Sequence, residues 1–178
     1  MILNVITLPQ RKEQIKSEVD RLGITAVYWD AIVQSNTVQA VSQSHKMIVQ
    51  FALQNNLPEI AIAEDDCIFS SINSYKYFLD NKPDDFDIYL GGYYSGIKRP
   101  DNTMYSFCGL HLYIIHSRYY RQFLSTSPMK NIDNAQAGFG KFVVCEPLVA
   151  RQRNGYSFHR KREVNDDSRL VDKNFLED

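Results

Sequence analysis

Cysteine is scarce in this chain. The three cysteines, Cys67, Cys108 and Cys145, stand far apart, each in an apolar stretch. No pair has CxxC spacing and none lies at a ligand spacing from a histidine, so neither a disulfide framework nor a structural zinc site is predicted. We expect all three to be reduced thiols, as is usual in a reducing compartment.

Long apolar runs and a basic leader are also missing. No apolar segment approaches the roughly 20 residues that a membrane-spanning helix needs. Residues 1–7 carry no basic residue ahead of an apolar core and lack the form of a secretory signal. The sequence therefore predicts a cytoplasmic protein, and contact with the inner face of a membrane is compatible with it.

Neither charge sign dominates, and the signatures of three large enzyme classes are absent. The net charge is -1, so a basic surface for nucleic acid is not predicted. The chain has no GxxxxGK and no GxGxxG loop, which argues against P-loop and dinucleotide-binding proteins. It has no GxSxG elbow either, so serine hydrolysis has no support.

The chain does contain an alternation of apolar strands and amphipathic helices. Alternation of this kind predicts an α/β fold with a Rossmann-like, mainly parallel sheet flanked by helices. A long polar and aromatic loop is expected at residues 93–106. We place one compact domain at residues 1–160 and a C-terminal tail, free to move, at 161–178. The predicted strands are 3–7, 24–29, 60–63, 86–90, 110–115 and, as the last, 142–145; the predicted helices are 10–22, 38–53, 72–79 and 118–124.

Three consecutive acids, Glu64, Asp65 and Asp66, follow the strand predicted at 60–63. Ligands of α/β sheets bind beyond the carboxyl ends of the strands, where this triplet falls. Repulsion and burial raise the pKa of such acids unless a cation neutralises them, and Mg²⁺ and Mn²⁺ prefer carboxylate and phosphate oxygens. Because side chains alternate along a strand, we expect Glu64 and Asp66 to face one cleft and Asp65 to face away. A solvated acidic turn is the structural alternative.

Basic side chains give weaker signals. Arg11 stands just past the first predicted strand, near a helix start, which suits phosphate contacts but equally suits a surface arginine. His45 lies on the apolar face of the helix predicted at 38–53, where a core histidine with satisfied hydrogen bonds is the more common explanation. The basic segment 151–162 suits a diphosphate or an anionic acceptor, or is a solvated surface.

Several segments occur in an order that one family shares. Ser44-His45, followed by a helix and then by IAIAEDDCIF at 60–69, is similar to the pattern S-H … L-E-D-D-x-x-F. Residues 5–11 (VITLPQR) resemble an opening strand I-N-L-x-x-R, and residues 86–91 (FDIYLG) resemble W-D-x-x-x-L-G. Together these segments resemble the LPS-type glycosyltransferases of family 25. Further similar segments are WDAI at 29–32, GLHLYII at 109–115, Ile132-Asp133, and PLVARQ at 147–152 with Ser157.

The resemblance implies a GT-A fold and a nucleotide-sugar donor, usually UDP-linked. It also implies a divalent metal, Mn²⁺ or Mg²⁺, and inversion at the transferred sugar. The implied acceptor is a carbohydrate or glycolipid of a surface glycan such as lipopolysaccharide. At the acidic triplet it implies that Asp66 is a metal ligand, that Glu64 contacts the ribose or sugar of the donor, and that Asp65 supports both.

Four residues outside the triplet receive roles from the same resemblance. Arg11 and His45 would line the nucleotide pocket. Asp133 would act as general base or orient the acceptor. His159 would be an additional metal ligand from the C-terminal segment.

Two alternatives stay open. The chain is shorter than typical members of the family, which motivates a degenerate GT-A domain that binds nucleotide or glycan without turnover. A metal-dependent phosphoryl transferase or hydrolase would need a second set of acids placing another metal about 4 Å away. The remaining acidic pairs are Asp84-Asp85 and Asp166-Asp167.

Overall fold

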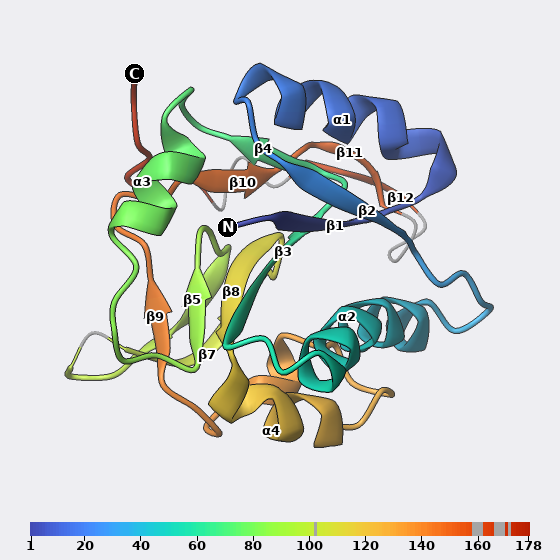
Figure 1. The fold of residues 1–178 in the computed structure, drawn as a ribbon, viewed down its shortest axis with the longest axis vertical. Coiled ribbons are helices and arrows are strands. Elements are labelled where there is room, and N and C mark those ends of the chain that lie inside the picture. The colour runs from blue at the N-terminus through green and yellow to red at the C-terminus, as the bar shows by residue number, and fades with distance from the viewer. Residues whose placement is uncertain (102, 158–161, 166–169, 171) are drawn as a thin grey trace.

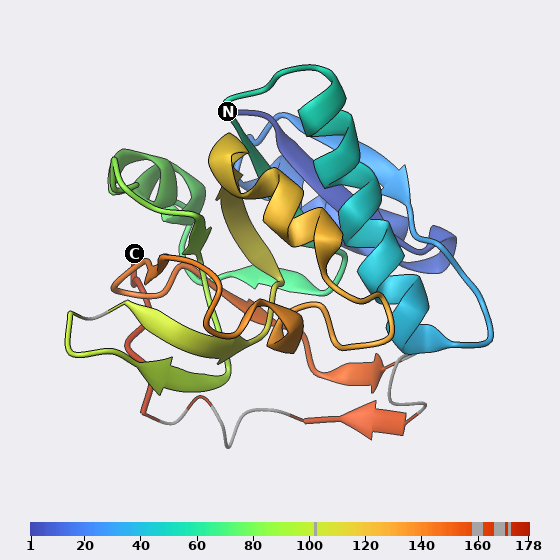
Figure 2. The ribbon, with the colours of Figure 1, turned by 90° about the horizontal axis from the view of Figure 1, so that it is seen from below.

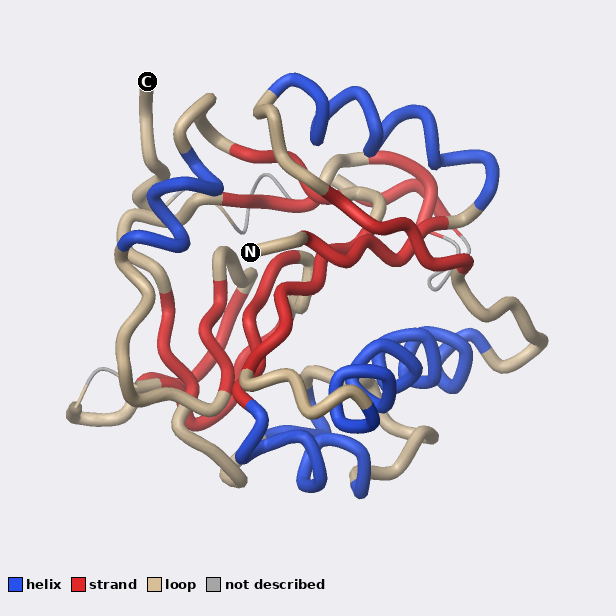
Figure 3. Tube along the Cα trace, viewed as in Figure 1, coloured by secondary structure: helices blue, strands red, loops and turns tan. Residues whose placement is uncertain are grey.

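Helices cover both faces of one large sheet (Figure 1). The computed structural model describes residues 1–101, 103–157, 162–165, 170 and 172–178. Helices α1 (Lys12–Arg21) and α3 (Ser74–Asp80) pack on one face, and α2 (Thr37–Gln54) and α4 (Tyr120–Ser125) pack on the other. Figure 3 shows these helices surrounding the strands. Short 3-10 turns lie at Pro9–Arg11, Ser117–Tyr119 and Asn134–Gln136.

The sheet contains eight described strands in the order β2-β1-β3-β8-β5-β9-β7-β6. Strands β8 and β7 make only antiparallel pairs, and the other six share one direction. The predicted α/β fold, a mainly parallel sheet flanked by helices, is confirmed. The bounds are β1 Leu3–Thr7, β2 Ala26–Asp30, β3 Glu59–Glu64, β5 Ile88–Leu90, β6 Ser95–Lys98, β7 Met104–Cys108, β8 Leu112–His116 and β9 Phe142–Val144.

Two apolar clusters hold the layers together. Ile48 and Phe123 belong to the cluster between the sheet and α2 with α4, and Ile15 and Phe78 belong to the cluster under α1 and α3. Figure 2 shows α2 and α4 side by side against the sheet. All five residues of β1 are buried because both of its faces are covered. Three of them are apolar, and the two polar ones, Asn4 and Thr7, donate side-chain hydrogen bonds to backbone oxygens.

The connection from β2 to α2 is fixed by side-chain hydrogen bonds. The side-chain oxygen of Asn36 accepts from the backbone N–H of Gln39 at 3.1 Å and caps α2. The hydroxyl of Ser44, about two turns further along the same helix, accepts from the backbone N–H of Ile32 at 2.9 Å. The loop that leaves the carboxyl end of β2 is therefore held against the amino-terminal half of α2.

The second half of the chain contains more strands than its sequence pattern predicts. The loop expected at 93–106 is wrong, because β6 and β7 form a hairpin there. The strand at 142–145 is not the last, because β10 (Ala150–Gln152) pairs with β4 (Cys67–Phe69), and β11 (Gly155–Ser157) pairs with β12 (Arg162–Val164). All four residues of β6 are exposed, so they have no apolar periodicity to detect.

The described residues near the end of the chain contact the domain. Phe175 bridges Leu148, and the backbone N–H of Leu176 donates to Leu148 at 2.8 Å. The Asp178 carboxylate accepts from the backbone N–H of Ile72 at 2.7 Å. Within the described residues, no helix has the length and apolar character needed to cross a membrane.

Candidate functional site

The carboxyl ends of β1, β2 and β3 meet at one edge of the sheet, because the three strands are parallel neighbours. A cleft of about 740 Å³ opens at this edge. It is the location where α/β sheets bind their ligands. Residues that follow each of the three strands line the cleft, together with three later segments: 8 and 11 after β1, 31–34 after β2, 64–66 after β3, and 108–110, 131–133 and 152–155.

Glu64 and Asp66 face the same side of the cleft. One amide nitrogen, Nε2 of Gln152, donates to Oε2 of Glu64 at 2.7 Å and contacts both carboxylate oxygens of Asp66 at 3.2 and 3.4 Å. The pairing of β10 with β4 sets Gln152 opposite Cys67, directly beside the triplet. Glu64 and Asp66 thus face one cleft as expected, although Asp66 lies in the turn between β3 and β4 rather than in a strand.

Asp65 turns toward the end of β1. Its carboxylate accepts from the backbone N–H of Leu8 at 2.7 Å and from the guanidinium of Arg11 at 3.1 Å. The guanidinium also lies 3.8 Å from Asp66. Asp65 therefore joins the end of β1 to the end of β3. Asp65 and Arg11 both line the cleft, so Asp65 does not face fully away from it as alternation predicted.

We expect Asp65→Ala to destabilise the fold, because the backbone N–H of Leu8 loses its acceptor. The hydrogen bond is part-buried, so loss of the acceptor costs about 1 kcal/mol, which corresponds to a melting temperature lower by about 2–4 °C for a chain of this size. Thermal unfolding checks this. The control Asp65→Asn keeps one acceptor oxygen and should lose less. An Asp65→Ala protein that melts with the wild type would show that the link carries no stability.

The pKa values of the three acids shift by different amounts and in different directions. Burial and the charges of Glu64 and Asp65 raise the pKa of Asp66 well above its usual range. Burial also raises the pKa of Asp65, against the opposing effect of its bonds to Leu8 and Arg11. Burial would raise the pKa of Glu64 as well, but the hydrogen bond and charge of His45 lower it overall. Asp66 is thus the acid that gains most from a nearby cation.

His45 is buried beneath the cleft and holds Glu64 in place. Its Nε2 lies 3.0 Å from Oε1 of Glu64, and its Nδ1 lies 3.0 Å from the hydroxyl of Tyr113. Both ring nitrogens therefore have partners. Since Glu64 is held by His45 on one oxygen and Gln152 on the other, its carboxylate has a fixed orientation toward the cleft.

Asp133 lines the same cleft. Its two carboxylate oxygens accept from the backbone N–H of Gly109 at 2.9 Å and from that of Asn134 at 2.7 Å. The side chain therefore caps the 3-10 turn that follows it and anchors the segment after β7.

The structure thus gathers Arg11, His45 and Asp133 around the acidic triplet. His159 lies outside the described residues. Sequence reasoning missed Gln152 and Tyr113 as parts of the site. Gln152 was visible only as the last residue of a segment shared with a family, and Tyr113 appeared to be one more apolar strand residue.

The donor atoms at the triplet fit a hard cation. Glu64 and Asp66 offer carboxylate oxygens, and Gln152 brings an amide; such oxygens suit Mg²⁺ or Mn²⁺ rather than a metal that prefers sulfur. Within the described ranges, no three His, Cys, Asp or Glu side chains are grouped to hold a metal. Mg²⁺ commonly takes one or two carboxylates from the protein and its other ligands from water and substrate phosphates.

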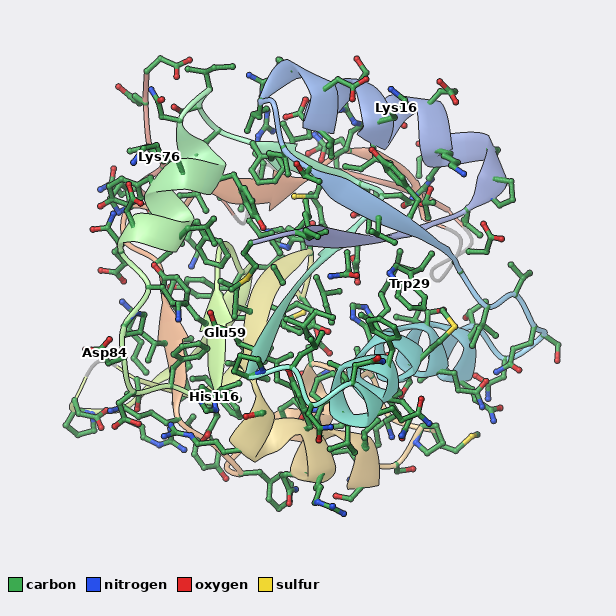
Figure 4. All side chains as sticks on the ribbon, viewed as in Figure 1. Lys16, Trp29, Glu59, Lys76, Asp84 and His116 are labelled. Atoms are coloured by element: carbon green, nitrogen blue, oxygen red, sulfur yellow. The ribbon has the colours of Figure 1, made fainter. Side chains whose placement is uncertain are left out.

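A second set of acids is not placed beside the triplet in the described part of the chain. Asp84-Asp85 precedes β5, which runs in the same direction as β3, so the pair lies at the end of the sheet where these strands begin. Figure 4 shows Asp84 on the same side of the molecule as Glu59, at the start of β3, and away from Trp29, at the end of β2. Asp166-Asp167 lies outside the described residues.

Comparison with known proteins identifies the fold. No family model and no curated protein matches the sequence. Protein A197 from STIV is similar in structure, with a TM-score of 0.53 and 14% identity over 92% of both chains. A glycosyltransferase involved in glycosylation of the major capsid of PBCV-1 has a TM-score of 0.52 and 11% identity, over 82% of this chain and 81% of that one.

A third similar structure is a Drosophila β-1,4-galactosyltransferase 7 mutant in complex with manganese, UDP-Gal and xylobiose. Its TM-score is 0.50 with 11% identity, over 92% of this chain and 74% of that one. The fold is of the GT-A type. At these identities the likeness concerns the fold, and function has to be argued from the cleft.

Proposed function

We propose that the protein is a glycosyltransferase that moves a sugar from a UDP-sugar to a carbohydrate acceptor with the help of Mn²⁺ or Mg²⁺. The observation that carries the proposal is the convergence of Glu64 and Asp66 on one cleft at the carboxyl end of β3. A diphosphate matches this arrangement best. A cation bound by the two acids would also bind phosphate oxygens, and the guanidinium of Arg11 lies beside the acids. The family 25 resemblance supports the same reaction.

Each residue then has a task. Asp66, with Glu64, would hold the cation, whose chemistry is to neutralise the charge that grows on the leaving diphosphate. Arg11 would bind a phosphate oxygen, and Asp65 would hold Arg11 in place. His45 would keep the Glu64 carboxylate oriented, which lowers the cost of organising the site at the moment of reaction.

Transfer requires that the acceptor hydroxyl attack the anomeric carbon while the bond from that carbon to the diphosphate oxygen breaks. The hydroxyl proton must pass to a base. Asp133 is our candidate, because it lines the same cleft as the triplet. We propose a surface glycan such as lipopolysaccharide as the acceptor, at the cytoplasmic face of a membrane that the protein contacts peripherally.

One observation favours a second function, nucleotide binding without turnover. Both oxygens of Asp133 already accept backbone hydrogen bonds, from Gly109 and Asn134. A carboxylate engaged in this way has a structural role as a cap. To act as a base it would have to accept the proton on its remaining lone pairs. In a degenerate domain the cation site would remain and the base would be purely structural.

A donor panel separates the two functions. We expect the protein with Mn²⁺ to release UDP from at least one UDP-sugar, and to do so faster when an oligosaccharide acceptor is added. EDTA should stop the release. UDP binding without release from any donor, with or without acceptors, would favour the degenerate domain and contradict the transferase.

A further inference from the structure

The side chain of Gln152 occupies the space between two carboxylates. Its Nε2 lies 2.7 Å from Oε2 of Glu64 and 3.2 and 3.4 Å from the two oxygens of Asp66. The backbone N–H of Arg153 donates to the carbonyl of Asp66 at 2.7 Å, so the end of β10 is fastened to the triplet through the main chain as well. A side chain held this firmly has a defined place relative to both acids.

The amide nitrogen lies within hydrogen-bonding distance of both carboxylates. Its two N–H groups carry partial positive charge and satisfy both carboxylates, as a cation would. A cation placed between Glu64 and Asp66 would repel these N–H groups. A half-turn about the last side-chain bond exchanges nitrogen for oxygen without moving the backbone, and an amide oxygen is a ligand that hard cations accept.

We propose that Gln152 is a positioning residue and ligand of the cation site. In the metal-free protein its N–H groups hold Glu64 and Asp66 together, and in the loaded protein the turned amide offers its oxygen to the cation. This inference rests on the proposed function, since it assumes that a cation binds at the triplet. It makes β10, which carries Gln152, part of the cation site together with the acids at the end of β3.

If Gln152 has only a structural role, the expected change in cation affinity on its removal has the opposite sign. If the amide only neutralises the acids, it competes with the cation, and removing it should tighten cation binding. If it is also a ligand, removing it should weaken cation binding. The sign of the change therefore decides between the two.

The test uses Gln152→Met, which keeps the length of the side chain without its polar atoms, and Gln152→Glu, which keeps an oxygen ligand. Gln54→Met, at the exposed end of α2, is the matched control. Calorimetry measures UDP affinity with Mn²⁺ and with EDTA, and thermal unfolding measures stability with and without Mn²⁺. We expect Gln152→Met to weaken Mn²⁺-dependent UDP binding at least about tenfold, equal to roughly 1.4 kcal/mol.

Gln152→Glu should melt below the wild type without metal, because it adds a fourth acid to the cluster. With Mn²⁺ and UDP it should gain more stability than the wild type gains. Unchanged or tighter binding by Gln152→Met, or no added stabilisation of Gln152→Glu by the cation, would overturn the assignment; if Gln152→Met does not fold, Gln152→Glu decides alone. A wild type without Mn²⁺-dependent UDP binding would instead refute the proposed function itself.

Discussion

Asp66→Ala should abolish cation-dependent UDP binding and lower turnover at least about 100-fold, which corresponds to roughly 2.7 kcal/mol of lost transition-state stabilisation. Asp66 has the most strongly raised pKa of the triplet because of its burial and its two acidic neighbours. A cation would relieve that repulsion, so the loss of this carboxylate would remove the main reason for a cation to bind. Released UDP and calorimetric affinity are the measurements.

The same substitution should leave the fold intact. The Asp66 side chain is 26% exposed, and its removal relieves repulsion in the metal-free protein. We expect the melting temperature to stay at or above that of the wild type. Asp84→Ala, which removes an exposed acid at the end of the sheet where β3 and β5 begin, is the control and should keep both binding and turnover. An Asp66→Ala protein that binds UDP with the wild-type Mn²⁺ dependence would remove Asp66 from the site.

Gly92→Ala should produce the largest loss of stability. A Cβ atom at Gly92 would lie 2.0 Å from the backbone oxygen of Ala150 and 2.4 Å from Nε2 of the buried His111. Neither neighbour is the free end of a flexible side chain, so β10 would have to move. Overpacking of this severity costs about 3 kcal/mol or more, and β10 carries Gln152 into the cleft. We expect a lower melting temperature together with weaker UDP binding.

Gly23→Ala is the matched control. Gly23 has a φ of +63° with no atom within 4 Å of the added Cβ, so its replacement meets backbone strain but no clash. The cost should be about 1 kcal/mol, without effect on UDP affinity. If Gly92→Ala melted with the wild type, the close approach of the ends of β5 and β10 would not exist in solution.

The first half of the fold is readable from the sequence. The strand predicted at 3–7 matches β1, Leu3–Thr7, and the helix predicted at 38–53 matches α2, Thr37–Gln54. Both elements are covered by other layers, so the strand is mostly apolar and the helix has an apolar face, and both patterns can be recognised in the sequence. The position of the acidic triplet at the end of β3 follows from these elements.

The second half is not readable in the same way. Strands β4 and β10 have three residues each, too few for any period to appear. They nevertheless place Gln152 beside Glu64, 88 positions away in the sequence. Contacts between residues so far apart in sequence depend on the pairing of β10 with β4, and no local sequence pattern predicts that pairing. Asp65 shows the same limit, since alternation alone could not show that its carboxylate would bind the backbone of Leu8.

Calorimetric titration of the wild-type protein with UDP, once with Mn²⁺ and once with EDTA, tests the account most directly. The acids at the end of β3 contact His45, Gln152 and Arg11, and we propose that this arrangement binds a cation. We therefore predict saturable binding of one UDP per chain with Mn²⁺ and an affinity at least about tenfold lower with EDTA. Equal affinity under the two conditions, or no binding of UDP in either, would contradict a cation-dependent nucleotide site in this cleft.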